Sequence, residues 1–287
     1  MRIFVADAFT DTVFCGNQAG VVLLGEGDFP KDDFMQSLAG ELKHSETAFV
    51  RQTGPNGFHI RYFTPAGEVD LCGHATIASF SVLRDEGMIL PGKFALKTLA
   101  GDLNIEVSGT AVWMDMAPPV EAKTFTQEEY APIYSAYGLD PACCPPGFAP
   151  KAVSTGLLDI LLPVATLADL ANAVQDEAEV TRLSTLHGVV GVHMFCVTGE
   201  AGITAHCRNF APLYAIPEEA ATGTSNGGLT YYLWRQGIIA PAAENLFLQG
   251  EHMGKPSKIR SRLFETEGKI TVQIGGNAVI ALRCTLQ

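Results

Sequence analysis

Residues 68–76 read Glu68-Val-Asp-Leu-Cys-Gly-His-Ala-Thr76, which puts a glycine and small residues where an apolar helix begins. A shorter stretch of the same kind, Thr222-Gly-Thr-Ser225, follows 150 positions later, counted from Gly73 to Gly223. The first turn of a helix has backbone N–H groups without intrahelical partners, and the helix dipole adds positive potential, so a carboxylate can bind there. Two such turns in corresponding positions predict a substrate held between paired helix ends.

The sequence around the two turns repeats. Arg61-Tyr-Phe-Thr-Pro65 corresponds to Arg208-Asn-Phe-Ala-Pro212, and each segment precedes its glycine turn by a short connection. Beyond the turns, Gly87 and Gly237 each lie fourteen residues after the turn glycine. These matches indicate two similar halves.

A third pair of segments extends the repeat. Residues 101–112 match residues 268–279, and in both the apolar residues alternate up to a glycine turn, as in a strand and the start of its hairpin partner. A period this long predicts a duplicated domain, because solenoid units run to about 20–50 residues.

The length and composition fit two folded domains. A chain of 287 residues with 47% hydrophobic and 17% charged residues can bury substantial cores. We predict an N-terminal half-domain at 1–116, joined by a C-terminal strand at 277–287, and a second half-domain at 117–276. Its loop at 145–150 is rich in proline.

Net charge and cysteine content limit the partners and the compartment. The formal net charge of −12, without a basic run, argues against nucleic acid and anionic membranes. Asp7 and Asp11 interrupt the apolar run that a signal peptide needs, and no apolar stretch approaches the roughly 18 residues of a membrane helix. Seven cysteines give no disulfide framework, and no C-x-x-C or H-x-x-x-H pair is present. We therefore expect a cytoplasmic protein without a metal.

Apolar spacing predicts the main elements. Alternation indicates strands, and spacing of three to four residues, as in Phe34, Leu38 and Leu42, indicates helices. The predicted strands are 2–8, 19–24, 44–50 and 58–63, and the predicted helices are 31–42, 75–87 and 228–237. The helix at 75–87 is apolar on nearly all sides, so we expect it to be buried.

Glu46, His74 and one of the pair Glu218 and Glu219 are candidates for proton transfer. Glu46 lies in a strand of apolar neighbours, where a partly desolvated carboxylate could take a proton from carbon, although it could also simply face solvent. His74 at a helix start could donate a hydrogen bond or shuttle a proton, or could only cap the helix. Glu218 and Glu219, before the second turn, are either a solvated pair or include a second acid/base group.

Two other mechanisms are less favoured. Cys72 next to a helix start could act as a racemase base, but the matching residue in the second half is Thr222, so a two-thiol mechanism lacks its partner. Residues 223–227 fit the G-x-S-x-G elbow of serine hydrolases, with Glu244 and His252 in the hydrolase order. That elbow needs a strand before it, and 216–221 contains a proline and two acids, which makes it a poor strand.

Six segments occur together over nearly the whole chain. They are Asp7-Ala-Phe-Thr-Asp11 with Gly16-Asn17, Ser45-Glu-Thr-Ala-Phe49, Arg61-Tyr-Phe-Thr-Pro65, the stretch at 68–76, Thr222-Gly-Thr224, and Gly275-Gly-Asn-Ala-Val279. Together they resemble the PhzF-like phenazine-biosynthesis isomerases, and among them the block around Cys72 is quite specific.

The resemblance implies an α/β (α+β) fold like that of diaminopimelate epimerase. In that fold two pseudo-symmetric domains each wrap a curved, barrel-like, mostly antiparallel sheet around a central helix. The active site lies between the domains, no cofactor is used, and the usual assembly is a homodimer. The phenazine enzyme moves a double bond in a dihydro-hydroxyanthranilate by acid/base proton transfer.

The resemblance also assigns site residues. The catalytic glutamate of the family falls on Glu46 and its histidine on His74, with Glu219 as the third catalytic group. The expected substrate-binding residues are Asn17, Asp70, Gly73, Gly223 and Thr224, and no metal ligand is expected.

Two positions depart from the family pattern. Glu219 stands where the family usually has aspartate, and Thr224 where it has serine. Both changes keep the chemical type and add a carbon, which predicts a substrate other than the phenazine precursor.

We expect a cofactor-independent isomerase that acts on a small carboxylate-bearing molecule. An epimerase or racemase of an amino-acid-like substrate is the alternative on the same fold, and a non-catalytic binding protein is a third. The physiological substrate and pathway do not follow from the sequence. We expect Glu46, His74, Glu219 and Thr224 to line one cleft between the halves.

Overall fold

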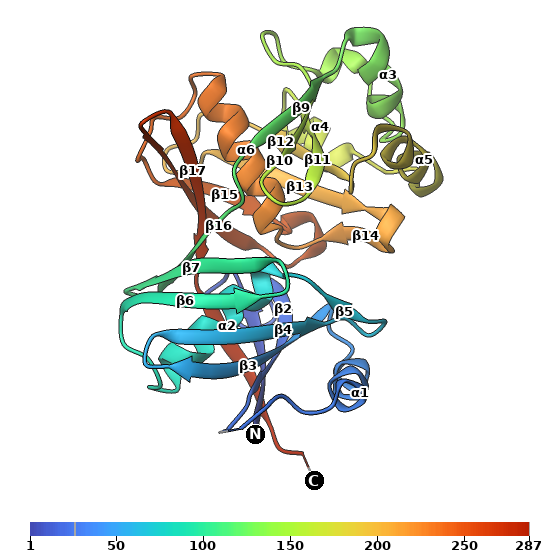
Figure 1. Ribbon diagram of the computed structural model, residues 1–287. Helices are drawn as coiled ribbons and strands as arrows, with labels where there is room; N and C mark the ends of the chain where they lie inside the picture. Colours follow the sequence, from blue (N-terminus) through green and yellow to red (C-terminus); the bar gives the residue numbers. More distant parts are fainter. Residues whose placement is uncertain (26, 287) are drawn as a thin grey trace. The chain divides into compact units, whose positions relative to one another are not determined.

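A computed structural model describes residues 1–25 and 27–286 (Figure 1). The chain forms two compact units, Met1–Asp115 with Gly275–Gln287 and Met116–Ile274. The division predicted from the sequence placed these boundaries after residues 116 and 276. In the described part of the chain, no helix is long and apolar enough to cross a membrane.

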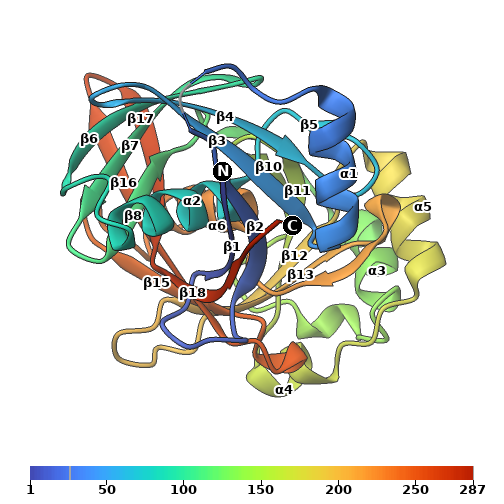
Figure 2. The ribbon, with the colours of Figure 1, turned by 90° about the horizontal axis from the view of Figure 1, so that it is seen from below.

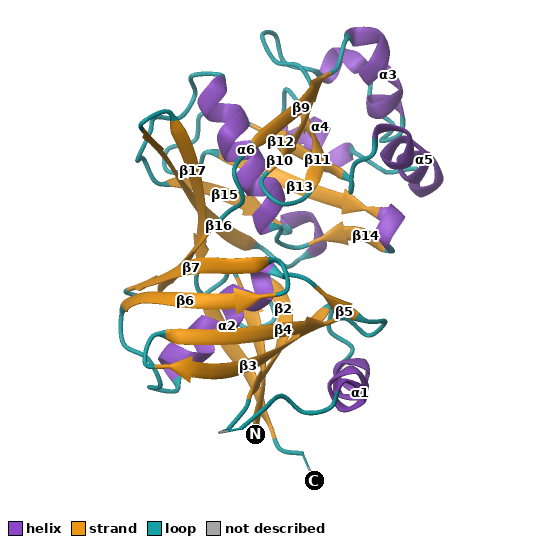
Figure 3. Ribbon diagram, in the orientation of Figure 1, coloured by secondary structure: helices purple, strands orange, loops and turns teal. Residues whose placement is uncertain are grey.

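The first unit is a curved, mostly antiparallel sheet wrapped around one helix (Figure 3). Hydrogen bonding joins its long strands in the order β18-β1-β2-β3-β4-β6-β7-β8, with β5 beside β4. The strands are β1 (Arg2–Ala8), β2 (Asn17–Leu23), β3 (Glu46–Gly54), β4 (Gly57–Phe63), β5 (Glu68–Val69), β6 (Gly92–Thr98), β7 (Gly101–Ser108), β8 (Ala111–Asp115) and β18 (Ala278–Cys284).

Helix α2 (Gly73–Asp85) is the core of this unit. It packs against β1, β2, β3, β8 and β18, and every residue from His74 to Leu83 is buried, as its apolar sequence predicted (Figure 2). The hydroxyls of Thr76 and Ser79 donate to the carbonyls of Cys72 and Ala75, each at 2.7 Å, so these polar groups are satisfied inside the core. Helix α1 (Asp32–Leu42) covers β3 and β4 from outside.

The second unit is built in the same way around helix α6 (Gly223–Arg235), which packs against β10, β11 and β16. Its sheet follows the order β9-β10-β11-β12-β13-β15-β16, with β14 beside β13. The strands are β9 (Val120–Thr124), β10 (Lys151–Ser154), β11 (Leu158–Pro163), β12 (Val192–Cys196), β13 (Ala205–Ala211), β14 (Ile216–Glu219), β15 (Asn245–Gln249), β16 (Ser257–Thr266) and β17 (Lys269–Gly276). The outer helices are α3 (Gln127–Ser135), α4 (Leu167–Asn172) and α5 (Glu177–His187).

The two units share one topology. From β2 to β7 the pairings alternate parallel, antiparallel, parallel, antiparallel, and the same alternation runs from β11 to β16. Helices α2 and α6 also end alike. Met88 N–H donates to the Leu83 carbonyl at 2.9 Å, and Ile238 N–H donates to the Leu233 carbonyl at 3.0 Å, each across a glycine with positive φ.

Two details of the sequence interpretation are wrong. Segment 101–112 was matched to 268–279, but β7 pairs with β6 as β16 pairs with β15, so β16 is the counterpart of β7. An alternating strand before a glycine turn recurs in several hairpins. The sequence match therefore paired β7 with β17, one strand after its true counterpart β16. Residues 216–219 also form a strand, β14, although the sequence was judged poor for one. The strand tolerates Pro217 because it pairs with β13 only through Ile216 and Glu219.

Candidate active site

Glu46 and His74 meet in the first unit. Glu46 begins β3, and His74 is the second residue of α2, with its ring 5% exposed. The parallel register of β2 and β3 pairs Ala19 with Glu46, so the starts of both strands lie together beneath the start of the helix. His74 Nε2 is 3.2 Å from Glu46 Oε2. The structure therefore brings the two main catalytic candidates into contact.

Two further side chains hold the imidazole of His74. The amide nitrogen of Asn17 is 3.3 Å from Nδ1, and Ser45 Oγ is 3.3 Å from Nε2. An amide nitrogen can only donate, so in a neutral imidazole this contact makes Nδ1 the acceptor and Nε2 the protonated nitrogen, on the side of Glu46. The contact to Glu46 lies within ion-pair distance but is not a hydrogen bond.

Cys72 completes this cluster. Its Sγ is 3.4 Å from Nδ1 and 3.8 Å from Nε2 of His74. A sulfur nearly equidistant from both ring nitrogens lies over the face of the imidazole. Cys72 is 7% exposed and packs as a small buried side chain.

The same three residues could hold a metal ion, because Glu46, Cys72 and His74 each offer a ligand atom and these atoms lie within 4.8 Å of one another. No metal site was predicted from the sequence, which lacks C-x-x-C and H-x-x-x-H pairs. Glu46 and Cys72 lie on separate elements and form no local motif. Metal binding would require the imidazole to turn, because Sγ lies over the ring and not beside a nitrogen lone pair.

The other predicted residues of the first unit flank this cluster. Gly73 is the first residue of α2, and a Cβ there would meet only Met114 Cε at 3.5 Å. Asp70 is exposed in the loop before the helix, where its carbonyl accepts from Ala100 N–H at 3.3 Å. The cluster thus contains Asn17, Glu46 and His74, while the side chain of Asp70 faces solvent.

Glu219 lies at the start of α6 in the second unit. Thr222 Oγ donates to Glu219 Oε2 at 2.5 Å, and the amide of Gln249 donates to the Glu219 carbonyl at 2.8 Å. Gln249 also accepts from Thr222 N–H at 3.2 Å, which fixes the turn before Gly223. The carboxylate is therefore held beside the first residue of the helix.

Thr224 occupies in α6 the position that His74 occupies in α2, the second residue of the helix. Its carbonyl accepts from Thr155 Oγ at 2.8 Å, and its methyl group would lie 3.5 Å from a Cβ at Gly156. Gly223, the residue before it, is buried.

Glu218 has a different role from Glu219. Both of its carboxylate oxygens accept from Arg208, each at 2.9 Å. The first unit contains the same arrangement, in which Arg61 donates twice to Glu68 at 2.6 Å. Glu218 is thus engaged in the repeated Arg–Glu pair.

Two buried titratable residues of the second unit were missed by the sequence analysis. Asp159 in β11 is 3% exposed and accepts from Ser225 Oγ at 2.6 Å. Burial, and to a smaller extent the charge of Glu219, raises the pKa of Asp159 to about 6. His193 in β12 is fully buried, with Nδ1 3.0 Å from Asn209 Oδ1, and burial lowers its pKa to about 4. A lone polar residue within an apolar strand was the available signal in both cases.

The serine hydrolase alternative is not supported. Ser225 is 2% exposed and its hydroxyl donates to Asp159, so it is neither accessible nor paired with a histidine. His252 is exposed, and Glu244 forms an ion pair with Arg260 at 3.2 Å. A strand does precede the turn, but the rest of the triad is not assembled.

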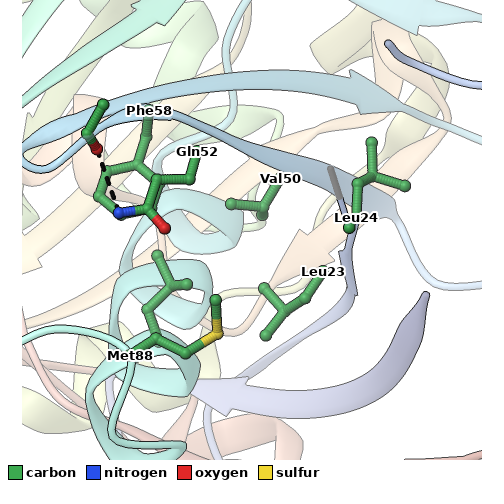
Figure 4. A pocket seen from close by; sticks show the side chains of 9 residues that line it. Leu23, Leu24, Val50, Gln52, Phe58 and Met88 are labelled. Carbon is green, nitrogen blue, oxygen red and sulfur yellow. Dashed lines mark hydrogen bonds between the residues drawn. The ribbon is translucent and has the colours of Figure 1, made fainter. Parts of the chain in front are cut away.

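A hollow of about 410 Å³ lies at the other end of β2 and β3 (Figure 4). Its lining includes Leu23, Val50, Phe58, Leu83 and Met88 and is mainly apolar. None of the predicted site residues lines it.

The fold and the site define a class of protein. Two units of one topology, each with a helix that begins at a glycine turn, form the diaminopimelate epimerase-like fold. A probable proline racemase from Agrobacterium radiobacter shares it, with a TM-score of 0.65 at 11% identity over 100% of this chain and 92% of that one.

The family follows from sequence comparison. Residues 6–283 match the family described as phenazine biosynthesis-like protein. An uncharacterized isomerase of Deinococcus radiodurans is 33% identical over 95% of this chain and 90% of its own length. A PhzF-family protein of Bacillus anthracis has a TM-score of 0.89 at 25% identity, covering 100% of this chain and 99% of that one. The chain belongs to the phenazine biosynthesis-like family of isomerases.

Proposed function

We propose that this isomerase moves a proton and a double bond in a small carboxylate-bearing substrate by carboxylate acid/base catalysis, without a cofactor. The observation that carries this proposal is the 3.2 Å contact between Glu46 Oε2 and His74 Nε2 at the start of α2. A carboxylate poised there can accept a proton from carbon, and a neutral imidazole can donate a hydrogen bond to the substrate.

Five further predicted site residues have a part in the proposal. Asn17 fixes the tautomer of His74 by donating to Nδ1. The first-turn amides at Gly73 and Gly223 bind the anionic groups of the substrate, since helix N-termini favour negative charge. Thr224 contributes its hydroxyl, and Glu219 guides the return of the proton.

A position in the second unit favours isomerisation over two-base epimerisation. Thr47 pairs with Phe63, and Val192 pairs with Phe210, which is the repeat counterpart of Phe63. Gly191 is therefore the counterpart of Glu46. A Cβ at Gly191 would collide with the carbonyl oxygen of Phe210, so no side-chain base fits there. An epimerase with a base in each unit would have to use Glu219 instead, and this remains the second candidate function.

Proton transfer requires Glu46 and the Gly223 turn to contact one substrate. We propose that the substrate binds between the two helix starts, which requires Glu46 to lie within about 15 Å of Gly223. A crystal structure with a bound carboxylate tests this distance, and a larger separation would contradict the shared site.

Solvent deuterium distinguishes the candidate functions. The protein is incubated in D₂O with unsaturated and amino-acid carboxylates, and ultraviolet spectra and mass spectra are recorded. Isomerisation changes the absorbance as unsaturation moves. Epimerisation labels a stereocentre without that change, and a binding protein gives neither signal. Label incorporation that persists unchanged in Glu46→Gln would contradict the role of Glu46.

By its family resemblance, we also propose that the protein works as a homodimer in the cytoplasm. Its acidic composition, with a net charge of −12, fits a small-molecule enzyme that does not bind nucleic acid or anionic membranes. Analytical ultracentrifugation of the full chain tests the assembly, and a monomer at micromolar concentration would contradict it.

A further inference from the structure

Asp159 is a buried acid directly behind the start of α6. Its Oδ2 accepts from Ser225 Oγ at 2.6 Å, and Ser225 is the third residue of the helix. The Gly191 backbone N–H also hydrogen-bonds its carboxyl group. Asp159 is thus tied to the same turn that begins at Gly223.

The corresponding place in the first unit is occupied by alanine. The strand registers pair Gly20 with Thr47 and Ile160 with Val192, so Ala19 is the counterpart of Asp159. The helix positions in turn make Ala75 the counterpart of Ser225. Ala19 and Ala75 are both fully buried. The fold therefore does not require an acid and a hydroxyl at these places.

The surroundings of Asp159 act on its pKa in both directions, and the net effect is a rise. Burial and the charge of Glu219 raise its pKa to about 6, whereas the hydrogen bonds from Ser225 and Gly191 lower it. The charges of Arg208, Glu218 and Asp159 also act on the pKa of the buried Tyr137 hydroxyl. Arg208 and Glu218 pair with each other. A charge change at Asp159 near neutral pH therefore occurs next to the helix end.

We propose that Asp159 is a positioning residue that makes carboxylate binding at the start of α6 depend on pH. This inference rests on the proposed function in one respect, that the turn at Gly223 binds a substrate carboxylate. Ionised Asp159 places a negative charge behind the amides of Gly223, Thr224 and Ser225 and opposes a second anion in front of them. Neutral Asp159 leaves the dipole of α6 uncompensated.

The direction of the effect follows from linkage. Below about pH 6 Asp159 is protonated and binding is stronger, and above that pH it ionises and binding weakens. By reciprocity, a bound carboxylate raises the pKa of Asp159. Removing the hydroxyl of Ser225 removes a bond to the ionised form, so the midpoint moves to higher pH.

The experiment follows the backbone amide NMR signals of residues 223–225 in the full chain. Without ligand, these signals should titrate with a midpoint near pH 6 in the wild type and should not do so in Asp159→Asn. Benzoate is then titrated at pH 5 and at pH 7.5. We expect its Kd at these amides to rise at least about fivefold with pH in the wild type, at the lower end of typical coupling between sites.

Three variants make the outcome decisive. Asp159→Asn and the double change Asp159→Ala with Ser225→Ala, which restores the Ala–Ala pair of the first unit, should both give a Kd independent of pH. Ser225→Ala alone should keep the dependence with a higher midpoint. Ser261→Ala is the control, because Ser261 is also buried under α6. It accepts at 2.7 Å from the hydroxyl of Thr230, which lies five residues beyond Ser225 in the helix.

Two results would overturn the inference. One is a wild-type pH dependence retained in Asp159→Asn and in the double variant. The other is a failure of benzoate to move the 223–225 signals at either pH. Neither result bears on the role of Glu46 as the base, because the isotope experiment with Glu46→Gln tests that role separately.

Discussion

Gly191 occupies in the second unit the place that Glu46 occupies in the first. The register of β12 and β13 fixes this equivalence, and the carbonyl of Phe210 leaves no room for a side chain at Gly191. The duplicated fold therefore has a carboxylate–imidazole pair at one helix start and none at the corresponding place. Under the proposed function, this asymmetry fits a single principal base, Glu46, in the first unit.

The first prediction concerns Glu46. Glu46→Gln keeps the shape of the side chain but cannot accept a proton, so turnover should fall by about 10²–10⁴-fold. The measurement is the rate of absorbance change with a substrate found in the carboxylate screen. Glu41→Gln, at an exposed position of α1, is the control and should keep the wild-type rate. Near-full turnover by folded Glu46→Gln would exclude Glu46 as the base.

Gly191 provides a test of packing. Gly191→Ala introduces a Cβ against the Phe210 carbonyl and should destabilise the protein by about 1–3 kcal/mol, as overpacking of a core does. Urea unfolding measures the change. Gly40→Ala is the matched control, because Gly40 lies in α1 with open space around it, and there alanine should be neutral or stabilise by up to about 1 kcal/mol. Equal stability of the two variants would contradict the collision.

The two Arg–Glu pairs should differ in their contribution to stability. Side-chain exposure is 7% for Arg208 and 15% for Glu218, and the Arg208 guanidinium also donates to the carbonyls of Leu170 and Ala173. Arg208→Met leaves the largely buried Glu218 carboxylate without this partner and should cost about 3–5 kcal/mol in unfolding free energy. Arg61→Met should cost less, on the order of 1 kcal/mol, because that pair is more exposed. The reverse order would be evidence against burial as the cause.

The sequence predicted most of the elements around the site because their signals are local. The strand at 2–8 and the buried helix after Gly73 follow from apolar spacing, and Glu46 and His74 lie in specific motifs. Their contact comes from strand register and helix packing, which sequence spacing does not encode. The same reason explains why Asp159 was missed, since only the fold brings β11 beneath the start of α6.

The error in the repeat has the same origin. Strands that alternate and end in a glycine turn look alike, so 101–112 resembled 268–279 although β7 corresponds to β16. By contrast, the helix starts at Gly73 and Gly223 were matched correctly, because glycine turns before long apolar helices are rarer than alternating strands.

His193 should make stability depend on pH. Burial lowers its pKa to about 4, below its value in the unfolded chain, so the unfolded state binds a proton that the native state excludes. As pH falls from 7 to 5, the unfolding free energy of the wild type should therefore fall by about 2 kcal/mol relative to that of His193→Gln. Asp159 changes stability with pH in the opposite direction, but it does so in both proteins, so its contribution cancels in this comparison. His252→Gln, at an exposed position, should show no such shift in urea unfolding. A difference that does not change with pH would contradict a neutral His193.

The last prediction concerns specificity. Glu219 and Thr224 each carry one carbon more than the aspartate and serine that the family resemblance places there, and Glu219 is held at the turn by Thr222. Extra bulk in a packed site costs about 1–3 kcal/mol, which is roughly 5- to 150-fold in affinity. We therefore expect weak or absent turnover of dihydro-hydroxyanthranilate, and improvement in the double variant Glu219→Asp with Thr224→Ser. The measurement is kcat/KM for that substrate, with Glu218→Asp as the control because Glu218 is engaged by Arg208. Rapid turnover by the unmodified protein would contradict the specificity argument and leave the assignment as an isomerase unchanged.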